Sequence, residues 1–216
     1  MNKNIIKLTS LLFAGGFILS SCEKEMSNYA PEKPIGGYTS AKQIAPDNLI
    51  AYWAFDGDLK DSVANLLATQ SNTSFISGKK GKALMGTSDG QVVVGEAGTV
   101  IPNLKSYTMS FWMNTQQATK ATGIFSINNN NGFWGNLDIY LESYVQNDIP
   151  NPDTLFFKVH MNNDNVNWKG QFTDTKIGAA VGKWVHIAIS YNANTSVYNI
   201  YQNGKQIGVN TAANPA

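Results

Sequence analysis

The stretch GKWVHIAISYNANTSVYNIYQNGK, residues 182–205, decides the fold of this chain. Its first half alternates between two sets of side chains, which is the period of two that a β-strand shows. The second half, Val197–Gln202, is rich in β-branched and aromatic residues, and Asn203-Gly204 after it favours a turn with positive φ. The stretch therefore predicts a β-hairpin. The two alternating sets are Val185, Ile187, Ile189 and Tyr191, against Trp184, His186, Ala188 and Ser190.

Short strand-like runs separated by glycine and other turn residues recur between residues 49 and 161. Several of them place apolar side chains on one side only, and two sheets that pack on such faces form an antiparallel sandwich. We find no stretch that supports a long helix. The expected fold class is therefore all-β. The runs are Leu49–Phe55, Thr73–Ser77, Ala83–Met85, Gln91–Val94, Ser106–Asn114, Gly123–Ile127, Asn136–Glu142 and Leu155–Met161.

Composition excludes several kinds of partner. The 216 residues include 16 basic and 15 acidic side chains, a net charge of +1. Without a basic block, nucleic acid and a charged membrane surface are not expected as main partners. The single cysteine excludes a disulfide framework.

The N-terminus carries a processing signal. Lys3 and Lys7 precede the apolar run Leu8–Leu19, and Leu19-Ser20-Ser21-Cys22 follows. The run is shorter than the roughly 20 residues that a membrane-spanning helix needs. It resembles a bacterial lipoprotein signal, which implies that Cys22 becomes the lipidated N-terminus; a membrane anchor or a plain secretory signal are the alternatives. Several acyl chains on that cysteine would give stable anchoring.

Three parts of the chain follow from this resemblance. Residues 1–21 are expected to be a signal peptide, residues 22–48 a lipidated N-terminus with a flexible tether, and residues 49–216 the folded domain. The expected location is the bacterial outer membrane. Glu23-Lys24-Glu25 is similar to the tag that routes some lipoproteins to the outer cell face, although an ordinary solvated linker would also be charged.

Five motifs in order resemble the laminin G-like branch of the concanavalin A-like lectin and glucanase superfamily. The resemblance implies a jelly-roll sandwich, a fold that carries lectins, enzymes and adhesion modules. Family members continue past the last motif to a strand that pairs with the N-terminal one. The resemblance therefore implies a C-terminally incomplete domain, with Val197–Gln202 and Leu49–Phe55 lacking neighbours. The motifs are YWAFDGDLKDSVAN, GKAL, SYTMSFWMN, GKWVHIAISY and YNIYQNGK.

The run 136–142, NLDIYLE, is the place to test for an enzyme. Retaining glucanases of the superfamily carry two glutamates that flank an aspartate on one strand. Here Asn136 occupies the first acidic position, and Glu142 is displaced by one residue. Because an amide cannot act as the carboxylate nucleophile, we expect no catalytic residues. Asp138, Tyr140 and Glu142 are candidates to bind sugar hydroxyls, against the alternative of an ordinary polar face.

Two tryptophans stand apart from the strand patterns. Trp134 and Trp168 lie in segments rich in asparagine and glycine. A flat ring beside amide groups suits a pyranose, so both are candidate carbohydrate-binding residues, with loop anchoring as the alternative. The tryptophans inside strand motifs, Trp53, Trp112 and Trp184, are assigned to packing, as are both histidines.

Calcium is a possible cofactor, since laminin G-like domains often bind it. Asp56, Asp58, Asp61 and Asn65 offer oxygen ligands near one corner of the predicted domain. Their spacing differs from that of an EF-hand loop.

The sequence thus predicts a lipid-anchored, non-catalytic module that recognises glycan at the bacterial envelope. The first alternative is a structural or adhesion module that binds another envelope protein, with Trp134 and Trp168 as interface anchors. The second is an accessory domain of a glycoside hydrolase.

Overall fold

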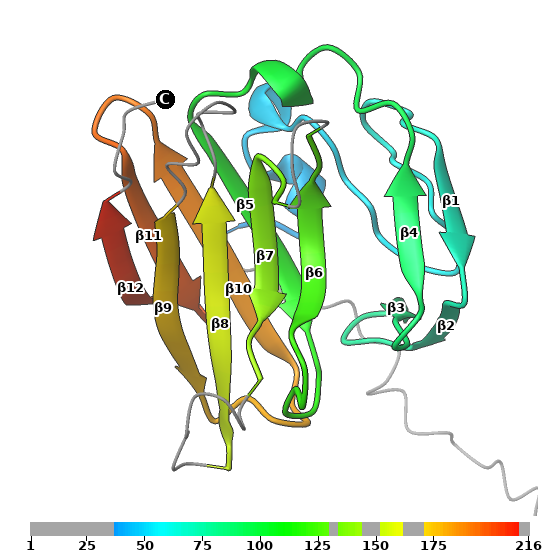
Figure 1. Ribbon diagram of the computed structural model, residues 1–216. Helices are drawn as coiled ribbons and strands as arrows, with labels where there is room; N and C mark the ends of the chain where they lie inside the picture. Colours follow the sequence, from blue (N-terminus) through cyan, green and yellow to red (C-terminus); the bar gives the residue numbers. More distant parts are fainter. Residues whose placement is uncertain (1–36, 130–133, 144–151, 162–170, 212–216) are drawn as a thin grey trace, which may run out of the picture. The chain divides into compact units, whose positions relative to one another are not determined.

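A computed structural model describes residues 37–129, 134–143, 152–161 and 171–211 (Figure 1). The chain forms two compact units, residues 1–47 and 48–216. In the first, Ser40 caps the short 3₁₀ helix η2 (Ala41–Gln43) through a capping box. No helix among the described residues is long and apolar enough to cross a membrane. Cys22 lies outside the described residues.

The second unit is built from antiparallel strands, which confirms the expected all-β class. Among the described residues of this unit, helical structure is limited to 3₁₀ segments, η3 (Pro46–Asn48, which begins in the first unit) and η4 (Ile101–Asn103). The strands are β1 (Ala68–Ser71), β2 (Ser74–Ser77), β3 (Lys82–Met85), β4 (Gln91–Val94), β5 (Tyr107–Met113), β6 (Thr122–Ile127), β7 (Leu137–Leu141), β8 (Thr154–Met161), β9 (Gln171–Gly178), β10 (Val185–Asn192), β11 (Val197–Gln202) and β12 (Lys205–Thr211).

Two four-stranded sheets form a sandwich (Figure 1). We call the sheet β12-β11-β10-β5 the β10 sheet, and the sheet β6-β7-β8-β9 the β8 sheet. Two smaller sheets, β1-β4 and β2-β3, precede them in the chain. The predicted hairpin is confirmed, since β10 pairs with β11 and places Ile189 opposite Ile200. The Asn203-Gly204 turn joins β11 to β12 with φ values of 49° and 79°, as its residue types predict.

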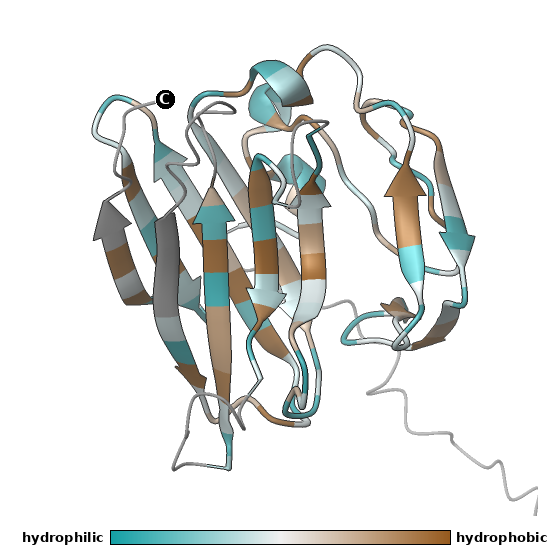
Figure 2. Cartoon of the chain, in the orientation of Figure 1, coloured by the Kyte–Doolittle hydropathy of each residue, from teal (hydrophilic) through white to brown (hydrophobic). Residues whose placement is uncertain are grey.

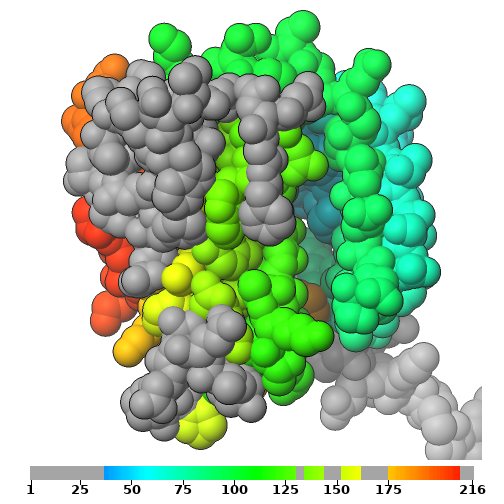
Figure 3. Space-filling view, in the orientation of Figure 1, coloured from blue at the N-terminus to red at the C-terminus, as the bar shows by residue number. Residues whose placement is uncertain are grey.

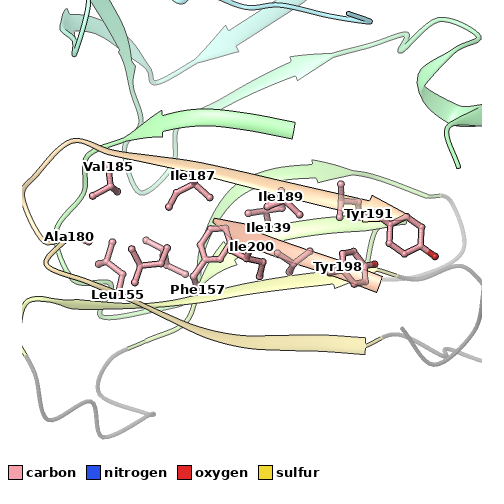
Figure 4. Packing of buried hydrophobic residues seen from close by; sticks show 14 of the residues in the cluster. Ile139, Leu155, Phe157, Ala180, Val185, Ile187, Ile189, Tyr191, Tyr198 and Ile200 are labelled. Carbon is pink, nitrogen blue, oxygen red and sulfur yellow. The ribbon is translucent and has the colours of Figure 1, made fainter. Parts of the chain in front are cut away.

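The core lies between the inner faces of the two sheets. Figure 2 shows hydrophobic and hydrophilic residues alternating along β7 and β8. The apolar set points inward, so Ile139, Phe157, Ile187 and Ile200 are each at most 1% exposed (Figure 4). Each such side chain contributes roughly 1.5–3 kcal/mol when it is fully buried. At one edge the sheets approach closely, because a Cβ on Gly208 of β12 would lie 2.8 Å from Oγ1 of Thr175 on β9.

Three tyrosines occupy one end of this core. The ring centroids of Tyr107 and Tyr191 are 5.8 Å apart, and those of Tyr191 and Tyr198 are 4.7 Å apart. Figure 4 shows Tyr191 and Tyr198 side by side at that end. Their three hydroxyls are buried and have no hydrogen-bond partner among the described residues. Burial, together with the neighbouring phenols, raises the pKa of Tyr107 and of Tyr198 above the ordinary value.

We predict that the domain loses stability in alkali because of these tyrosines. A phenol whose pKa is raised by folding stabilises the fold fully below its ordinary pKa of about 10, and this stability is lost as the pH rises above that value. Tyr198→Phe should therefore reduce the fall in melting temperature between pH 9 and pH 11. At pH 7 it should cost less than about 1 kcal/mol, because the hydroxyl makes no hydrogen bond. An unchanged alkaline fall in the variant would contradict this account.

Two expectations about strands are wrong. Leu49–Phe55 is not a strand: only Trp53 makes an isolated bridge, to Asp61, and Phe55 adopts a φ of 54° that interrupts extended backbone. Val197–Gln202 does have a neighbour, since β12 pairs with it throughout. The sequence patterns did not predict β1, β9 and β12, because these strands are short or rich in polar residues.

Candidate functional site

The outer face of the β8 sheet carries the polar side chains that the sequence singled out. Because β7 and β8 alternate strictly, the residues between the core positions point outward. The strand register places Asp138 opposite His160, and Tyr140 opposite Lys158. Part of this face is visible in Figure 3, in yellow-green.

Asp138 is the centre of a hydrogen-bond network on this face. Its Oδ1 accepts a hydrogen bond of 2.6 Å from Oγ of Ser126, and its Oδ2 one of 2.8 Å from the backbone N–H of Gly135. Nδ1 of His160 lies 3.2 Å from the same Oδ2. Gly135 approaches so closely that a Cβ there would be 2.5 Å from the carbonyl oxygen of Ile127. The carboxylate is therefore held from three sides, with its side chain 15% exposed.

His160 is completely buried although it lies on the outer face. Burial lowers its pKa, and the neighbouring Asp138 carboxylate opposes this effect without overcoming it. The imidazole is thus neutral at pH 7, and a proton on Nδ1 lets it donate to Asp138. His160 acts as a positioning residue for that carboxylate. Sequence reasoning missed this role, because the register that joins Asp138 and His160 is not visible in either strand alone.

Trp134 lies over this network. Its ring centroid is 4.8 Å from that of His160 and 5.8 Å from that of Tyr140, which is only 8% exposed. Its backbone carbonyl accepts a 2.8 Å hydrogen bond from Nδ2 of Asn129. The indole itself is half-buried, so it anchors its loop and still presents part of its ring. Trp168 lies outside the described residues.

Glu142 is on the same face but belongs to a second cluster. It forms an ion pair of 3.3 Å with Lys158, and both side chains are 18% exposed. The Lys158 ammonium lies 5.4 Å from the ring centroid of Phe156. The structure therefore brings Trp134, Asp138 and Tyr140 together and places Glu142 beside them, joined through Lys158.

The predicted calcium ligands lie at a different corner. The Asp61 carboxylate is completely buried and accepts hydrogen bonds from four backbone N–H groups. Burial tends to raise its pKa, but the four donors outweigh burial, so the pKa lies below its ordinary value. The donors are Tyr52 at 2.9 Å, Val63 and Ala64 at 3.0 Å, and Leu66 at 3.3 Å.

The other three candidates do not converge on Asp61. Asp56 accepts a hydrogen bond from the backbone N–H of Lys82 at 2.8 Å, and Asp58 accepts one from that of Lys60 at 3.0 Å. Asn65 is exposed and has a φ of 57°. Within the described ranges, no three acidic, histidine or cysteine side chains are placed to hold a metal ion. Asp61 does not fit a calcium ligand, because its oxygens are already engaged by amides. Calcium binding elsewhere remains a prediction.

A comparison with protein families decides the relationship. Residues 86–216 match the model of the concanavalin A-like lectin/glucanases superfamily, in its laminin G form. The match covers more than half of the chain. The chain belongs to this superfamily. The jelly-roll sandwich that the sequence motifs implied is thereby confirmed, and the superfamily fold is compatible with a non-catalytic module.

Solved structures give weaker likenesses. A heptameric SAP-like pentraxin from Limulus polyphemus is 15% identical, with a TM-score of 0.38, over 50% of this chain and 44% of that chain. A candidate carbohydrate binding protein from Bacteroides ovatus is 14% identical, with a TM-score of 0.38, over 68% of this chain and 32% of that one. A structure reported with endo-acting O-glycanases of human gut microbiota is 14% identical, with a TM-score of 0.39, over 72% of this chain and 61% of that chain.

These three likenesses carry no argument for activity, because each TM-score is below 0.5. The chain also spans less than two thirds of each of those proteins. A search of the curated proteins finds no match.

Asp138 on β7 and Glu142, one residue beyond its end, are not spaced as a hydrolytic pair. Asp138 and Glu142 are four residues apart, which is about 13 Å along an extended strand. A retaining pair needs about 5–5.5 Å and an inverting pair about 6.5–9.5 Å. Asn136, at the first acidic position, has its side-chain oxygen 3.2 Å from Nδ2 of Asn129.

Trp112 corrects a further expectation. It was assigned to packing, yet its side chain is 47% exposed on the outer face of the β10 sheet. Trp53 and Trp184 are half-buried. The alternation in β5 correctly separates Trp112 from the core residues Met109 and Phe111, but alternation does not say whether an outer face is covered.

Replacing Asp61 tests its structural role. Asp61→Asn should lower the free energy of unfolding by about 2 kcal/mol or more, because the amide loses the charge and turns a donor toward buried N–H groups. Asp58→Asn makes the same charge change at an exposed site and should stay within about 0.5 kcal/mol. Chemical denaturation measures both. Equal effects of the two substitutions would contradict the role given to Asp61.

Acid should weaken the domain through His160. Folding lowers its pKa, so the stability linked to this group is present above the ordinary pKa of about 6.5 and is lost as the pH falls below it. His160→Asn keeps a donor near Asp138 but does not titrate. The fall in melting temperature between pH 7.5 and pH 5 should be smaller in this variant than in the wild type. Burial also lowers the pKa of His186, so its titration should account for part of the fall in melting temperature that remains in the variant.

An equal fall in both proteins would show that His160 is not the titrating group.

Proposed function

We propose that the chain is a lipid-anchored, non-catalytic carbohydrate-recognition module of the bacterial envelope, held in the outer membrane through Cys22. The glycan contacts the outer face of the β8 sheet at Trp134, Asp138 and Tyr140, with Glu142 at the margin. The single observation that carries this proposal is the Trp134 ring seated on His160 and Tyr140 beside a fixed carboxylate.

The arrangement suits a sugar for two physical reasons. A pyranose needs a flat apolar surface and hydrogen-bond acceptors at its rim. Trp134 supplies the first, and its contacts hold the ring before any ligand arrives, which reduces the entropy lost on binding. Asp138 supplies the second, because three protein donors fix its direction while 15% of the side chain stays exposed.

The proposed absence of catalysis rests on charge placement. Glu142 is neutralised by Lys158, and its distance along the chain from Asp138 fits neither hydrolytic geometry. Superfamily membership supports glycan as the partner in general terms. Trp168 is a second proposed contact. Calcium has no proposed role at Asp61.

A glycan array probed with the full chain in detergent, with and without calcium, tests the proposal. We predict binding of at least one glycan class that does not require calcium. Trp134→Ala should weaken the best ligand at least about tenfold, equal to roughly 1.4 kcal/mol, whereas Trp134→Phe should retain more of the affinity because it keeps a flat ring. Melting temperatures show that each variant is folded.

Two results would overturn the proposal. One is an array without any bound glycan, which would favour the alternative of a structural or protein-binding surface module. The other is glycan binding that Trp134→Ala leaves unchanged. Release of reducing sugar by the wild type would instead favour the accessory or catalytic part of a glycoside hydrolase.

A further inference from the structure

The opposite outer face of the sandwich presents a second aromatic surface. Trp112 on β5 is 47% exposed, and the register places it directly opposite His186 on β10. The two ring centroids are 5.3 Å apart, and the ring planes are inclined by 59°. An exposed tryptophan with a fixed aromatic neighbour is a ready contact surface, since its ring is already oriented before a ligand binds.

Lys79 adds a positive charge to this surface. Its ammonium lies 5.3 Å from the centroid of the Trp112 ring, a cation–π distance. Lys79 is exposed, and no described carboxylate forms an ion pair with it. Burial lowers the pKa of His186, so this imidazole is neutral at pH 7 and offers hydrogen bonds rather than charge.

The neighbouring rows of the β10 sheet carry mostly small or polar side chains. Ser110, Ala188 and Tyr201 are cross-strand neighbours in the row next to Trp112, and the first two have small side chains. In the following row, Nδ2 of Asn199 lies 3.5 Å from Oγ of Ser190. None of these side chains is a carboxylate; they offer hydroxyl and amide groups, to which Lys79 adds an ammonium.

We propose that this face, defined by Trp112, His186, Ser110 and Lys79, binds an acidic sugar. The apolar side of a pyranose stacks on Trp112, its hydroxyls bond to His186 and Ser110, and its carboxylate or sulfate group pairs with the Lys79 ammonium. A sugar fits better than a protein partner, because one exposed ring among small polar side chains lacks the apolar centre of a protein interface. The Lys79 ammonium and the lack of carboxylates in these rows favour an anionic ligand.

This site is separate from the one under Proposed function, since it lies on the other sheet and shares no residue with it. Either site can bind glycan without the other. The face was not found from sequence because Trp112 alternates like a core neighbour, and only the fold shows that Trp112 is 47% exposed.

The test is an array that contains uronic, sialylated and sulfated glycans together with their neutral counterparts, probed with the full chain in detergent. We expect an acidic glycan to bind at least tenfold more tightly than its neutral counterpart. Trp112→Ala should weaken that binding at least tenfold and lower the melting temperature only slightly, because nearly half of the residue is exposed. Lys79→Gln should remove the preference for the acidic form and reduce the dependence of binding on salt.

Lys176→Gln is the matched control, because it removes the same charge from an exposed side chain on β9 of the other sheet, and it should leave this binding unchanged. If Trp112→Ala has no effect and Trp134→Ala abolishes acidic binding, the ligand belongs to the β8 sheet and the present inference is wrong. It is also wrong if no acidic glycan binds, or if neutral counterparts bind equally well. If Trp112→Ala removes the acidic-glycan binding and Trp134→Ala does not, the inference is supported, even if the β8 sheet binds no glycan.

Discussion

The rest of the structure depends on the packing of two apolar sheet faces against each other. Ile139 and Phe157 from the β8 sheet meet Ile187, Ile189 and Ile200 from the β10 sheet, and all are almost completely buried. Because the side-chain period of a strand is two, a shift of one residue would expose this whole set. The core thereby fixes the register, and the register decides which side chains share each outer face.

The register that the core fixes places different side chains on the two outer faces. On the β8 sheet, Asp138 and His160 are cross-strand partners, and Trp134 lies over them with its ring half-buried. On the β10 sheet, Trp112 and His186 are cross-strand partners, and Trp112 is 47% exposed. A fixed inner face therefore leaves two outer faces whose exposed residues can change independently.

Sequence patterns predicted the sandwich well where alternation is strong. Residues 182–205 and Asn136–Glu142 carry their own evidence, since side chains two apart reveal the buried face. The strand prediction failed at the compact run Leu49–Phe55, where the Asp61 carboxylate accepts the N–H of Tyr52 and Phe55 has a positive φ. That carboxylate acts across nine residues, which a local pattern cannot represent.

The site was predicted only in part, for a similar reason. Trp134, Asp138 and Tyr140 were chosen by residue type, but the pairing of Asp138 with His160 depends on which strand lies beside β7. Exposure is equally non-local: Trp112 and Trp184 look alike in their strand motifs. What covers an outer face is decided by segments far away in the chain.

The most direct test of glycan recognition is an NMR titration with a glycan that binds in the array. It follows the indole N–H signals of the five tryptophans as the glycan is added. The account predicts that the Trp134 signal moves and saturates with the glycan concentration, while the signal of half-buried Trp53 stays in place. Saturable binding that leaves the Trp134 signal unmoved would contradict glycan recognition at the β8 sheet.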